Sequence, residues 1–507
     1  MRFKIKGNYF NGNYQAPREN NKDNKLSYID RHCPANTDEL LWTCPVDLEA
    51  VDKVLESAQS GYDFWKRVPL TEKINYLKKY QENLIKIKDQ IAEAISLEMG
   101  KPLWEAMTEA NSLISKVDVT INDSLPRVKD QHYEEIMPQT MGHVFFKPLG
   151  PCLVIGPFNF PCHLANTQIL SALITGNSVI FKPSERTCYS AQLMMDCFHQ
   201  ASFPKGVINL INGAGEIASR LTRSKSIKGV FFTGSKEVGL RILETTHQDL
   251  SKLVALELGG KNPAIVHKDA DINLALEELI RGCYLTTGQR CTSTAVIFVH
   301  KSLVDQFVMK FHEISKRVII DHPIEHEVTP LMGPLVDQRA LDTYLLFMGM
   351  AKREGIEEIM RGKQLEKKYK GHYVSPSIHL ASKWDTKSLF LMSEIFGPNC
   401  TIVPYEEIEE AFAAISTIEY GLAACVFTKS DAIFKECILN IDSGLINLNR
   451  STCGASAKLP FGGVKNSGNY RPAAVATIDS CVYQMSSLEA LNAQAGNSAN
   501  LVGIKQD

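Results

Sequence analysis

The chain has 507 residues, enough for about two to four domains with substantial cores, and its 44% apolar and 22% charged residues are ordinary for a globular protein. A formal net charge of −2 provides no basic field that would attract nucleic acid or an anionic membrane. The sequence has no signal peptide, membrane-spanning run, C-x-x-C pair or Cys/His cluster, so we expect no metal and a cytoplasmic location where the 13 cysteines stay free.

The N-terminal region is predicted to begin with short strands and loops and to continue into helices. Residues 1–46 are polar and irregular, whereas the pattern from about Val46 to Ala110 is helical. Thr71 is the expected N-cap of one helix, and residues 133–146 are predicted to form a β-hairpin. Apolar residues at spacings of three, four or seven mark one buried helix face: Ile74, Leu77, Leu84, Ile87 and Ile91.

After Pro151, short apolar runs alternate with helix-length segments, which indicates β-α-β units and a parallel sheet covered on both faces. The predicted strands are residues 152–155, 179–181, 207–210, 230–232 and 253–258. The predicted helices are residues 164–173, 187–200 and 216–221. A second α/β stretch is expected over residues 263–448, with a charged surface loop or helix at 357–369. The tail after Ala490 is expected to be loosely ordered.

Cys291 is a candidate nucleophile because of its setting in G-Q-R-C-T. Gly288 allows the backbone to approach a ligand closely, and Arg290 adds a positive charge that favours a thiolate. A cysteine is more often a small buried apolar residue, so this motif alone leaves both interpretations open.

Glu257 is a candidate general base. It lies in an apolar strand that ends at two glycines, where a carboxylate is costly unless it is paired or functional. Burial raises the pKa of such a carboxyl group, which suits a base that works near neutral pH. The alternative is a structural glutamate bonded to backbone amides.

Three further motifs follow predicted strands. Asn159, in G-P-F-N-F-P, has an amide suited to a developing oxyanion, although asparagine is also common in simple turns. Lys182 and Glu185, in F-K-P-S-E, are suited to holding a ribose. Residues 231–239, F-F-T-G-S-K-E-V-G, form a strand, a Gly-Ser turn and a helix start that offers N–H groups to a diphosphate, without being the G-x-G-x-x-G fingerprint.

In this order and together, these motifs resemble the aldehyde dehydrogenase superfamily over nearly the whole chain. The resemblance implies an α/β fold with a Rossmann-like cofactor domain, an α/β catalytic domain and a small β oligomerisation arm. The matching segments are residues 156–161, 181–185, 232–239, 256–263, 288–291, 394–398 and 460–468.

The resemblance also implies roles for single residues. Cys291 matches the family's nucleophile and Glu257 its general base, while Asn159 and the backbone N–H of Cys291 match the oxyanion hole. The expected cofactor is NAD. Its expected ribose, diphosphate and nicotinamide contacts are Lys182, Glu185, Gly234, Ser235, Lys236, Glu237, Val238, Gly239, Glu394 and Phe396.

By the same resemblance, the chain is expected to divide into three units and to form a homodimer or homotetramer. The expected divisions are a cofactor-binding domain from 1–126 and 149–257, an oligomerisation hairpin at 127–148, a catalytic domain at 258–472, an oligomerisation strand at 473–490 and a tail at 491–507.

The C-terminal segments S-G-N-Y-R-P-A-A, residues 467–474, and M-S-S-L-E, residues 485–489, resemble a branch of the family that oxidises N-succinyl-L-glutamate 5-semialdehyde in arginine breakdown to glutamate and succinate. The substrate's carboxylates require local donors, and arginine provides two parallel hydrogen bonds. Arg450 and Arg471 are the candidate anchors, with a hydroxyl from Ser451 or Thr452. Either arginine could instead pair with a surface or interface carboxylate.

Three alternatives remain open from the sequence. The substrate could be another carboxylated semialdehyde, such as glutamate or succinate semialdehyde. An enzyme that transfers the acyl group to CoA would lack the base at the position of Glu257, so its presence favours hydrolysis. A non-catalytic structural or binding protein on this scaffold would have lost the nucleophile or the base, and both residues are present.

Overall fold

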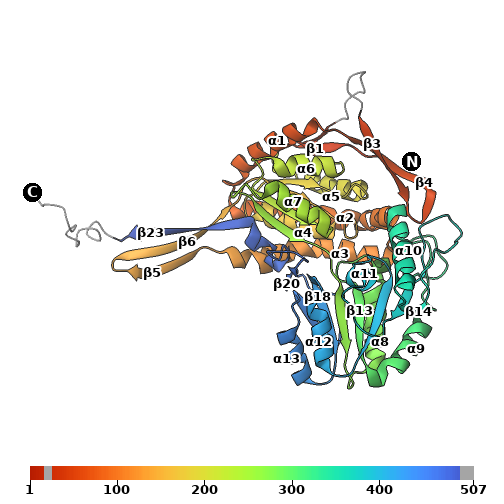
Figure 1. Cartoon of the computed structure of the whole chain (residues 1–507). Coiled ribbons are helices and arrows are strands. Elements are labelled where there is room, and N and C mark those ends of the chain that lie inside the picture. Colours follow the sequence, from red (N-terminus) through yellow and green to blue (C-terminus); the bar gives the residue numbers. More distant parts are fainter. Residues whose placement is uncertain (16–25, 492–507) are drawn as a thin grey trace, which may run out of the picture.

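The computed structural model describes residues 1–15 and 26–491. Two lobes, each a sheet covered by helices, lie against each other, and a long β arm projects from them (Figure 1). The Asn20–Asn24 run and residues 492–507 of the predicted tail lie outside the described residues.

The first lobe contains a seven-stranded sheet in the order β11-β10-β7-β8-β9-β1-β2. The first five strands run parallel, as predicted from the alternating pattern, whereas β1 and β2 add antiparallel pairs at one edge. The strand bounds are β1 Asn8–Phe10, β2 Asn13–Gln15, β7 Cys152–Ile155, β8 Val179–Lys182, β9 Ile208–Leu210, β10 Gly229–Thr233 and β11 Leu253–Glu257.

Helices α1 to α7 surround this sheet, and the predicted helical region before Ala110 forms the first three of them, the third of which continues to Val119. The helix bounds are α1 Ala50–Trp65, α2 Leu70–Met99, α3 Leu103–Val119, α4 His163–Ile174, α5 Cys188–Gln200, α6 Gly215–Arg223 and α7 Lys236–Thr246. A separate antiparallel pair, β3 Ser27–Cys33 and β4 Asn36–Val46, precedes them.

The second lobe contains another seven-stranded sheet, in the order β14-β15-β16-β13-β12-β18-β19. All neighbouring strands are parallel except the edge pair β14 and β15. The bounds are β12 Asn262–Val266, β13 Thr294–His300, β14 Glu357–Met360, β15 Ser377–Leu380, β16 Asn399–Tyr405, β18 Ala423–Phe427, β19 Leu445–Leu448, α8 Ile272–Tyr284, α9 Val304–Ser315, α10 Gln338–Arg353, α11 Leu389–Met392, α12 Ile408–Ser416 and α13 Asp431–Asn440.

The arm is a three-stranded sheet. The predicted hairpin is present as β5, Gln131–Met137, and β6, Thr140–Pro148, and the C-terminal strand β23, Val482–Ala490, pairs with β6 along its whole length. Figure 1 shows this sheet extending away from both lobes.

Two local predictions are wrong. Thr71 is not an N-cap, because α2 already begins at Leu70. The residue before the helix is Pro69, and its carbonyl accepts hydrogen bonds from the N–H groups of Glu72 and Lys73. The charged segment 357–369 is not all loop or helix, since its first four residues form β14. Charged side chains are tolerated there because β14 is an edge strand with one side open to water.

Each lobe buries an extensive apolar core. The predicted helix face lies against the first core, with Leu77, Leu84 and Ile91 fully buried and Ile74 and Ile87 partly buried beside them. Within residues 1–15 and 26–491, no helix is both long and apolar enough to cross a membrane.

Replacing Ile91 by Ala is expected to lower the free energy of unfolding by about 2–5 kcal/mol, because it leaves a cavity in a fully buried site. Leu439→Ala, on the exposed surface of α13, is the control and is expected to change the unfolding free energy by at most about 0.5 kcal/mol. Urea unfolding measures both values. A loss below about 1 kcal/mol for Ile91→Ala would contradict the core assigned to α2.

Candidate active site

Cys291 lies in a loop between the short 3-10 turn at Leu285–Gly288 and strand β13. All 13 cysteines are free thiols, and only Cys291 and Cys453 are not fully buried. Cys291 packs against the small cluster that contains Phe461.

The turn that precedes Cys291 has an unusual backbone. Thr286 and Thr287 have φ values of 57° and 56°, in the left-handed region that β-branched residues rarely adopt. Gly288 follows at φ 68°, and a Cβ there would lie 2.2 Å from the carbonyl oxygen of Gly397. Such strain persists only where the surroundings hold it in place.

Glu105, on α3, holds this turn. Its carboxylate accepts the Thr286 backbone N–H at 3.0 Å and the Thr286 hydroxyl, and it forms an ion pair with Arg290. Thr287 is fixed separately, since its hydroxyl donates to the Gly333 carbonyl at 3.0 Å. The nucleophile loop is therefore tied to the first lobe by a buried carboxylate.

The ion pair of Arg290 with Glu105 limits how far Arg290 lowers the pKa of the Cys291 thiol. Burial raises the pKa of Cys291 well above its ordinary value, and the charges of Glu257 and Glu394 raise it further, while Arg290 lowers it by a smaller amount. The expected effect of Arg290 on the pKa of Cys291 is therefore outweighed by burial.

Glu257 is the last residue of β11 and is almost fully buried. Neither of its carboxylate oxygens has a hydrogen-bond partner among the described residues. Burial raises the pKa of Glu257 well above its ordinary value, and Arg471 opposes this. The structural alternative, a glutamate bonded to backbone amides, does not describe this side chain.

The backbone around Glu257 is held by the C-terminal segment. Glu257 pairs with Gly468 in an antiparallel bridge, and the Asn469 amide bonds to the backbone of Val254 and Leu256. The Ser467 hydroxyl donates to the Gly259 carbonyl at 2.7 Å. These bonds fix the strand and leave the carboxyl group of Glu257 free.

Asn159 follows β7, and its side-chain amide donates to the Gln289 carbonyl at 2.9 Å. Its loop is anchored beside it, because the Phe160 ring lies 3.8 Å from the Lys101 ammonium and 5.1 Å from the Arg290 guanidinium. Asn159 thus meets the nucleophile loop two residues before Cys291.

Lys182 and Glu185 lie together at the end of β8. The Lys182 ammonium donates to the Pro183 carbonyl at 2.8 Å and lies 3.8 Å from Glu185, which is half-exposed. Burial lowers the pKa of Lys182. Arg186 lies 3.6 Å from Glu185 but is itself paired with Asp337 at 2.6 Å.

The turn at Gly234 and Ser235 leads into α7. The Gly234 N–H donates to the Glu257 carbonyl at 3.0 Å, and the Ser235 hydroxyl caps the helix by accepting the Val238 N–H. Because the α7 N-terminus lies next to the Glu257 strand, it offers an anion site close to the candidate base.

The side chains of the first turn of α7 differ in their surroundings. Lys236 pairs with Glu419 at 2.6 Å, whereas Glu237 and Val238 are exposed. Gly239 is buried, and a Cβ there would lie 2.8 Å from Leu258. Glycine therefore allows the helix to pack closely on the segment after β11.

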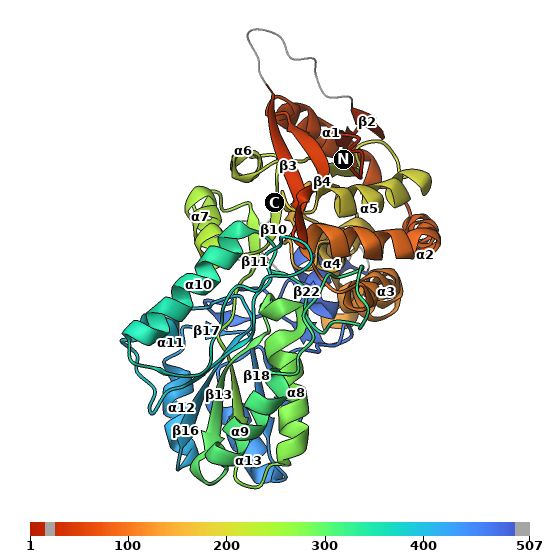
Figure 2. The same ribbon diagram turned by 90° about the vertical axis from the view of Figure 1, so that its right-hand side faces the viewer.

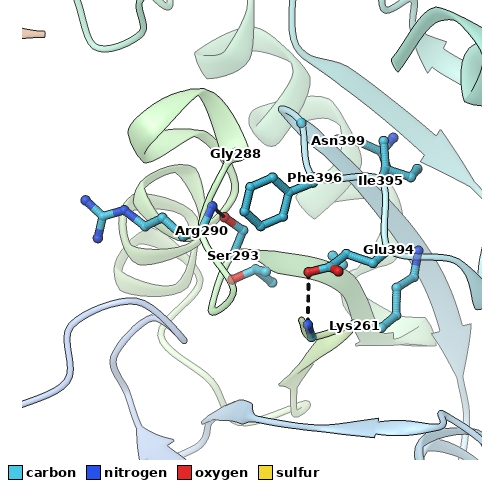
Figure 3. Close-up of a pocket in the computed structure, with 12 residues that line it drawn as sticks. Lys261, Gly288, Arg290, Ser293, Glu394, Ile395, Phe396 and Asn399 are labelled. Carbon is cyan, nitrogen blue, oxygen red and sulfur yellow. Dashed lines mark hydrogen bonds between the residues drawn. The ribbon is translucent and has the colours of Figure 1, made fainter. Parts of the chain in front are cut away.

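Glu394 and Phe396 line a cavity with the nucleophile loop (Figure 3). Glu394 accepts the Gly260 N–H at 2.9 Å, and burial raises its pKa to about 7. A Cβ at Gly259 would fall 2.0 Å from the Glu394 carboxylate, so only glycine leaves room for it. Figure 3 shows the Arg290 side chain directed away from Phe396.

The candidate substrate anchors are placed differently. Arg471 is half-buried and lies close enough for its charge to act on Glu257, whereas Arg450 is exposed. The Ser451 hydroxyl bonds to the backbone of Cys453, and the Thr452 hydroxyl bonds to Thr292 and Thr294. Both hydroxyls are thus already engaged within the protein.

A model of the aldehyde dehydrogenase family matches residues 21–486. The chain belongs to the aldehyde dehydrogenase family. It is 32% identical over 464 residues to N-succinylglutamate 5-semialdehyde dehydrogenase of Novosphingobium aromaticivorans, covering 90% of this chain and 95% of that one. It is 36% identical over 429 residues to the protein of the same name in Legionella pneumophila, covering 84% of each.

Solved structures give the same family. Betaine aldehyde dehydrogenase from Staphylococcus aureus, in complex with NAD+, is 25% identical with a TM-score of 0.89 over 99% of both chains. 1-Pyrroline-5-carboxylate dehydrogenase from Thermus, with bound NAD, is 25% identical with a TM-score of 0.87 over 96% of this chain and 92% of that one. The predictions of an aldehyde dehydrogenase fold and of an enzyme that uses a nicotinamide dinucleotide are confirmed.

Three residues that support the site of this aldehyde dehydrogenase were not predicted from the sequence. Glu105 holds the nucleophile loop, Asn469 holds the Glu257 strand, and the Asn262 amide donates to the carbonyls of Cys291 and Ser293 at 2.7 and 2.8 Å. Asn262 and Asn469 lie inside segments that the sequence analysis singled out, but each of the three residues acts on a partner elsewhere in the sequence.

Glu105→Gln is expected to lower kcat by at least about tenfold, because Arg290 loses its buried partner and the Thr286 turn loses its acceptor; breaking a buried pair costs about 3–5 kcal/mol. Steady-state kinetics measures the loss. Glu277→Gln, which removes an exposed ion pair with Arg281, is the control and should leave kcat unchanged. Wild-type kcat for Glu105→Gln would show that the turn does not depend on Glu105.

Proposed function

We propose that this enzyme oxidises a carboxylated semialdehyde through a thioester on Cys291 and that Glu257 activates the water that hydrolyses it. The observation that carries this proposal is the Glu257 carboxyl group: buried, without a hydrogen-bond partner among the described residues, and close enough for its charge to act on the Cys291 thiol. A buried carboxyl group that packing does not satisfy is suited to proton transfer.

In the proposed reaction, the Cys291 thiol loses its proton to water, and its sulfur attacks the aldehyde carbon. The Asn159 amide and the Cys291 backbone N–H donate to the oxyanion that forms. Asn159 reaches this loop already, through its bond to Gln289. Glu257 then takes a proton from water as the thioester is cleaved to the carboxylate.

We propose that the cofactor is NAD. When bound, the dinucleotide supplies the hydride acceptor that turns the thiohemiacetal into the thioester. The residues present fit this group, since Glu394 is a half-buried carboxylate with one backbone donor and the first turn of α7 begins at the Gly234–Ser235 turn. Lys182 and Glu394 would hold the riboses, the Gly234–Ser235 turn the diphosphate, and Phe396 would lie near the nicotinamide.

We propose N-succinyl-L-glutamate 5-semialdehyde as the substrate. The names of the relatives from Novosphingobium and Legionella support it. Arg471 is the better placed of the two predicted arginines, because it is half-buried near Glu257 while Arg450 is exposed. A guanidinium at this position can hold a carboxylate with two hydrogen bonds.

We propose that a second copy of this chain covers the arm. Its strands expose apolar side chains that a water-facing sheet would not favour. These are Tyr133, Ile136, Met137 and Leu488, with exposures of 46%, 52%, 45% and 60%. The 13 free thiols support the predicted cytoplasmic location, where thiols stay reduced.

The wild-type enzyme is expected to use N-succinylglutamate semialdehyde with at least about tenfold higher kcat/KM than an uncharged aliphatic aldehyde of similar length, since a charge-assisted contact contributes about 1.5–3 kcal/mol. NADH release over a panel that includes succinate semialdehyde and free glutamate semialdehyde measures the preference. A higher kcat/KM with either smaller semialdehyde would overturn the proposal of this specific substrate. A higher kcat/KM with the uncharged aldehyde would overturn the proposal that the substrate is carboxylated.

Glu257→Gln is expected to give a burst of NADH followed by slow turnover, because acylation needs Cys291 and Asn159 whereas hydrolysis needs a base. In the wild type, the raised pKa of Glu257 means that the carboxyl group is protonated at low pH, so deacylation should speed up as pH rises through that pKa. Rapid mixing at several pH values measures both phases. Cys291→Ala is the control and should give no burst; unchanged steady-state turnover in Glu257→Gln would remove Glu257 from the mechanism.

A preference for NAD over NADP of at least about tenfold in kcat/KM is expected, because Glu185 accepts from a ribose 2′-hydroxyl and repels a 2′-phosphate. Glu185→Gln should lower the ratio of kcat/KM with NAD to kcat/KM with NADP. Initial rates with both cofactors test this, with Glu216→Gln, an exposed carboxylate on α6, as the control. Equal efficiency of the two cofactors in the wild type would exclude this role for Glu185.

A further inference from the structure

One face of helix α3 carries three buried charges. Glu105, Glu109 and Lys116 follow one another at spacings of four and seven residues, which places them in one line along the helix. Figure 2 shows α3 beside α4, the helix that begins directly after the Asn159 loop. This face of α3 therefore lies next to the segments that carry the proposed chemistry.

The two glutamates on this face are each matched by a cation. Glu105 pairs with Arg290, and Glu109 pairs with Lys101 at 2.7 Å in a contact that is closed to water. Glu109 also accepts the backbone N–H groups of Cys162 and His163 at 3.1 and 3.2 Å. Both carboxylates are thus paired within the protein, and neither forms an ion pair with Lys116.

Lys116 is the unmatched charge. Its side chain is 2% exposed, yet no carboxylate of the described chain lies within ion-pair distance of its ammonium, which donates no hydrogen bond to another described residue. Burial lowers the pKa of Lys116 to about 8, with no opposing carboxylate. The residue is buried, but its Nζ is not among the buried polar atoms that are closed to water, so the ammonium is open to a partner from outside the chain.

His163, the first residue of α4, lies within range of the Lys116 charge. Burial and, to a smaller extent, the charges of Lys116 and Lys101 lower the pKa of His163 to about 3, so the ring is neutral. Its Nδ1 atom is buried and has no hydrogen-bond partner among the described residues. The ammonium and the ring nitrogen thus lie on two helices that pack together, α3 and α4, and neither has a partner among the described residues.

We propose that Lys116, assisted by His163, binds a carboxylate of the substrate and so selects carboxylated aldehydes. The inference deepens the proposed function and rests on it. The Asn159 loop ends two residues before His163, so a carboxylate held here belongs to a molecule whose aldehyde meets Asn159 and Cys291. A substrate with two carboxylates needs two anchors, and Lys116 provides one besides Arg471.

The competing explanation is that the Lys116 stem only fills space and its ammonium reaches water, as lysines often do. In that case, replacing Lys116 would affect all aldehydes alike, through packing. A carboxylate anchor would instead affect only substrates that carry the carboxylate. The two explanations therefore differ in one measurable quantity, the dependence of the loss on the substrate's charge.

The test compares Lys116→Met with the wild type on two aldehydes, N-succinylglutamate semialdehyde and an uncharged aldehyde of similar length. We expect kcat/KM for the charged aldehyde to fall by at least about tenfold, mostly through KM, and for the uncharged one by less than about threefold. Lys73→Met is the matched control, because Lys73 is also buried and has no carboxylate partner among the described residues. Lys73 is on α2, where it lies beside the Trp65 ring. It should change neither value.

A binding measurement separates this inference from the proposed function. N-succinyl-L-glutamate, the product, should slow the alkylation of Cys291 by iodoacetamide in the wild type and in Lys73→Met, and should protect Lys116→Met at least about tenfold less well. Protection that needs Lys116, in an enzyme that does not oxidise the semialdehyde, would overturn the proposed substrate and uphold the anchor. Equal protection in all three proteins, or equal loss of activity with both aldehydes, would overturn the anchor.

Discussion

The Glu105 carboxylate is the contact on which the geometry of the nucleophile loop depends. It reaches from α3 in the first lobe to Thr286 and Arg290 in the second and holds Thr286 in a left-handed backbone. A buried carboxylate is costly by itself, but here the Thr286 N–H, its hydroxyl and the Arg290 guanidinium satisfy the charge. Held in this way, the strained turn fixes Gln289. The carbonyl of Gln289 accepts a hydrogen bond from the Asn159 side-chain amide. One buried ion pair thus aligns the Cys291 loop with the Asn159 loop.

The candidate base, Glu257, is held through its backbone, whereas Glu105 forms its contacts through its side chain. Every contact that fixes Glu257 is made through the backbone of its strand, by Gly468, Asn469 and Gly234, and its own carboxyl group has no partner among the described residues. Burial without a partner raises its pKa. Glu105 and Glu257 are both almost fully buried, and the difference in their partners separates a structural carboxylate from one suited to proton transfer.

Much of the fold could be predicted from the sequence because the strands of the first sheet are short continuous apolar runs bounded by glycine and proline, a pattern that local chemistry dictates. The predicted positions of Glu257 and Asn159 at strand ends follow from the same pattern. Thr71 was misplaced because Pro69 takes the N-cap position of α2, and β14 was missed because an edge strand tolerates charged residues.

The supporting residues of the site could not be predicted in the same way. Glu105 acts on a residue 181 positions away, and Asn469 on one 213 positions away. No local pattern encodes such pairs, and threonine would not be assigned to a left-handed turn from its intrinsic preference. Lys116 is similar, since its unmatched charge is recognised only when its neighbours on α3 are seen to be paired.

The central claim is that Cys291 carries the acyl group and that Glu257 removes it. The most direct measurement is peptide mass spectrometry of the Glu257→Gln enzyme, mixed with NAD and the semialdehyde and quenched in acid after one turnover. The account predicts that the peptide containing Cys291 gains the mass of the substrate's acyl group and that the same peptide from wild type does not. An unmodified Cys291 peptide in a sample that has formed NADH, or an acyl group on another residue, would contradict it.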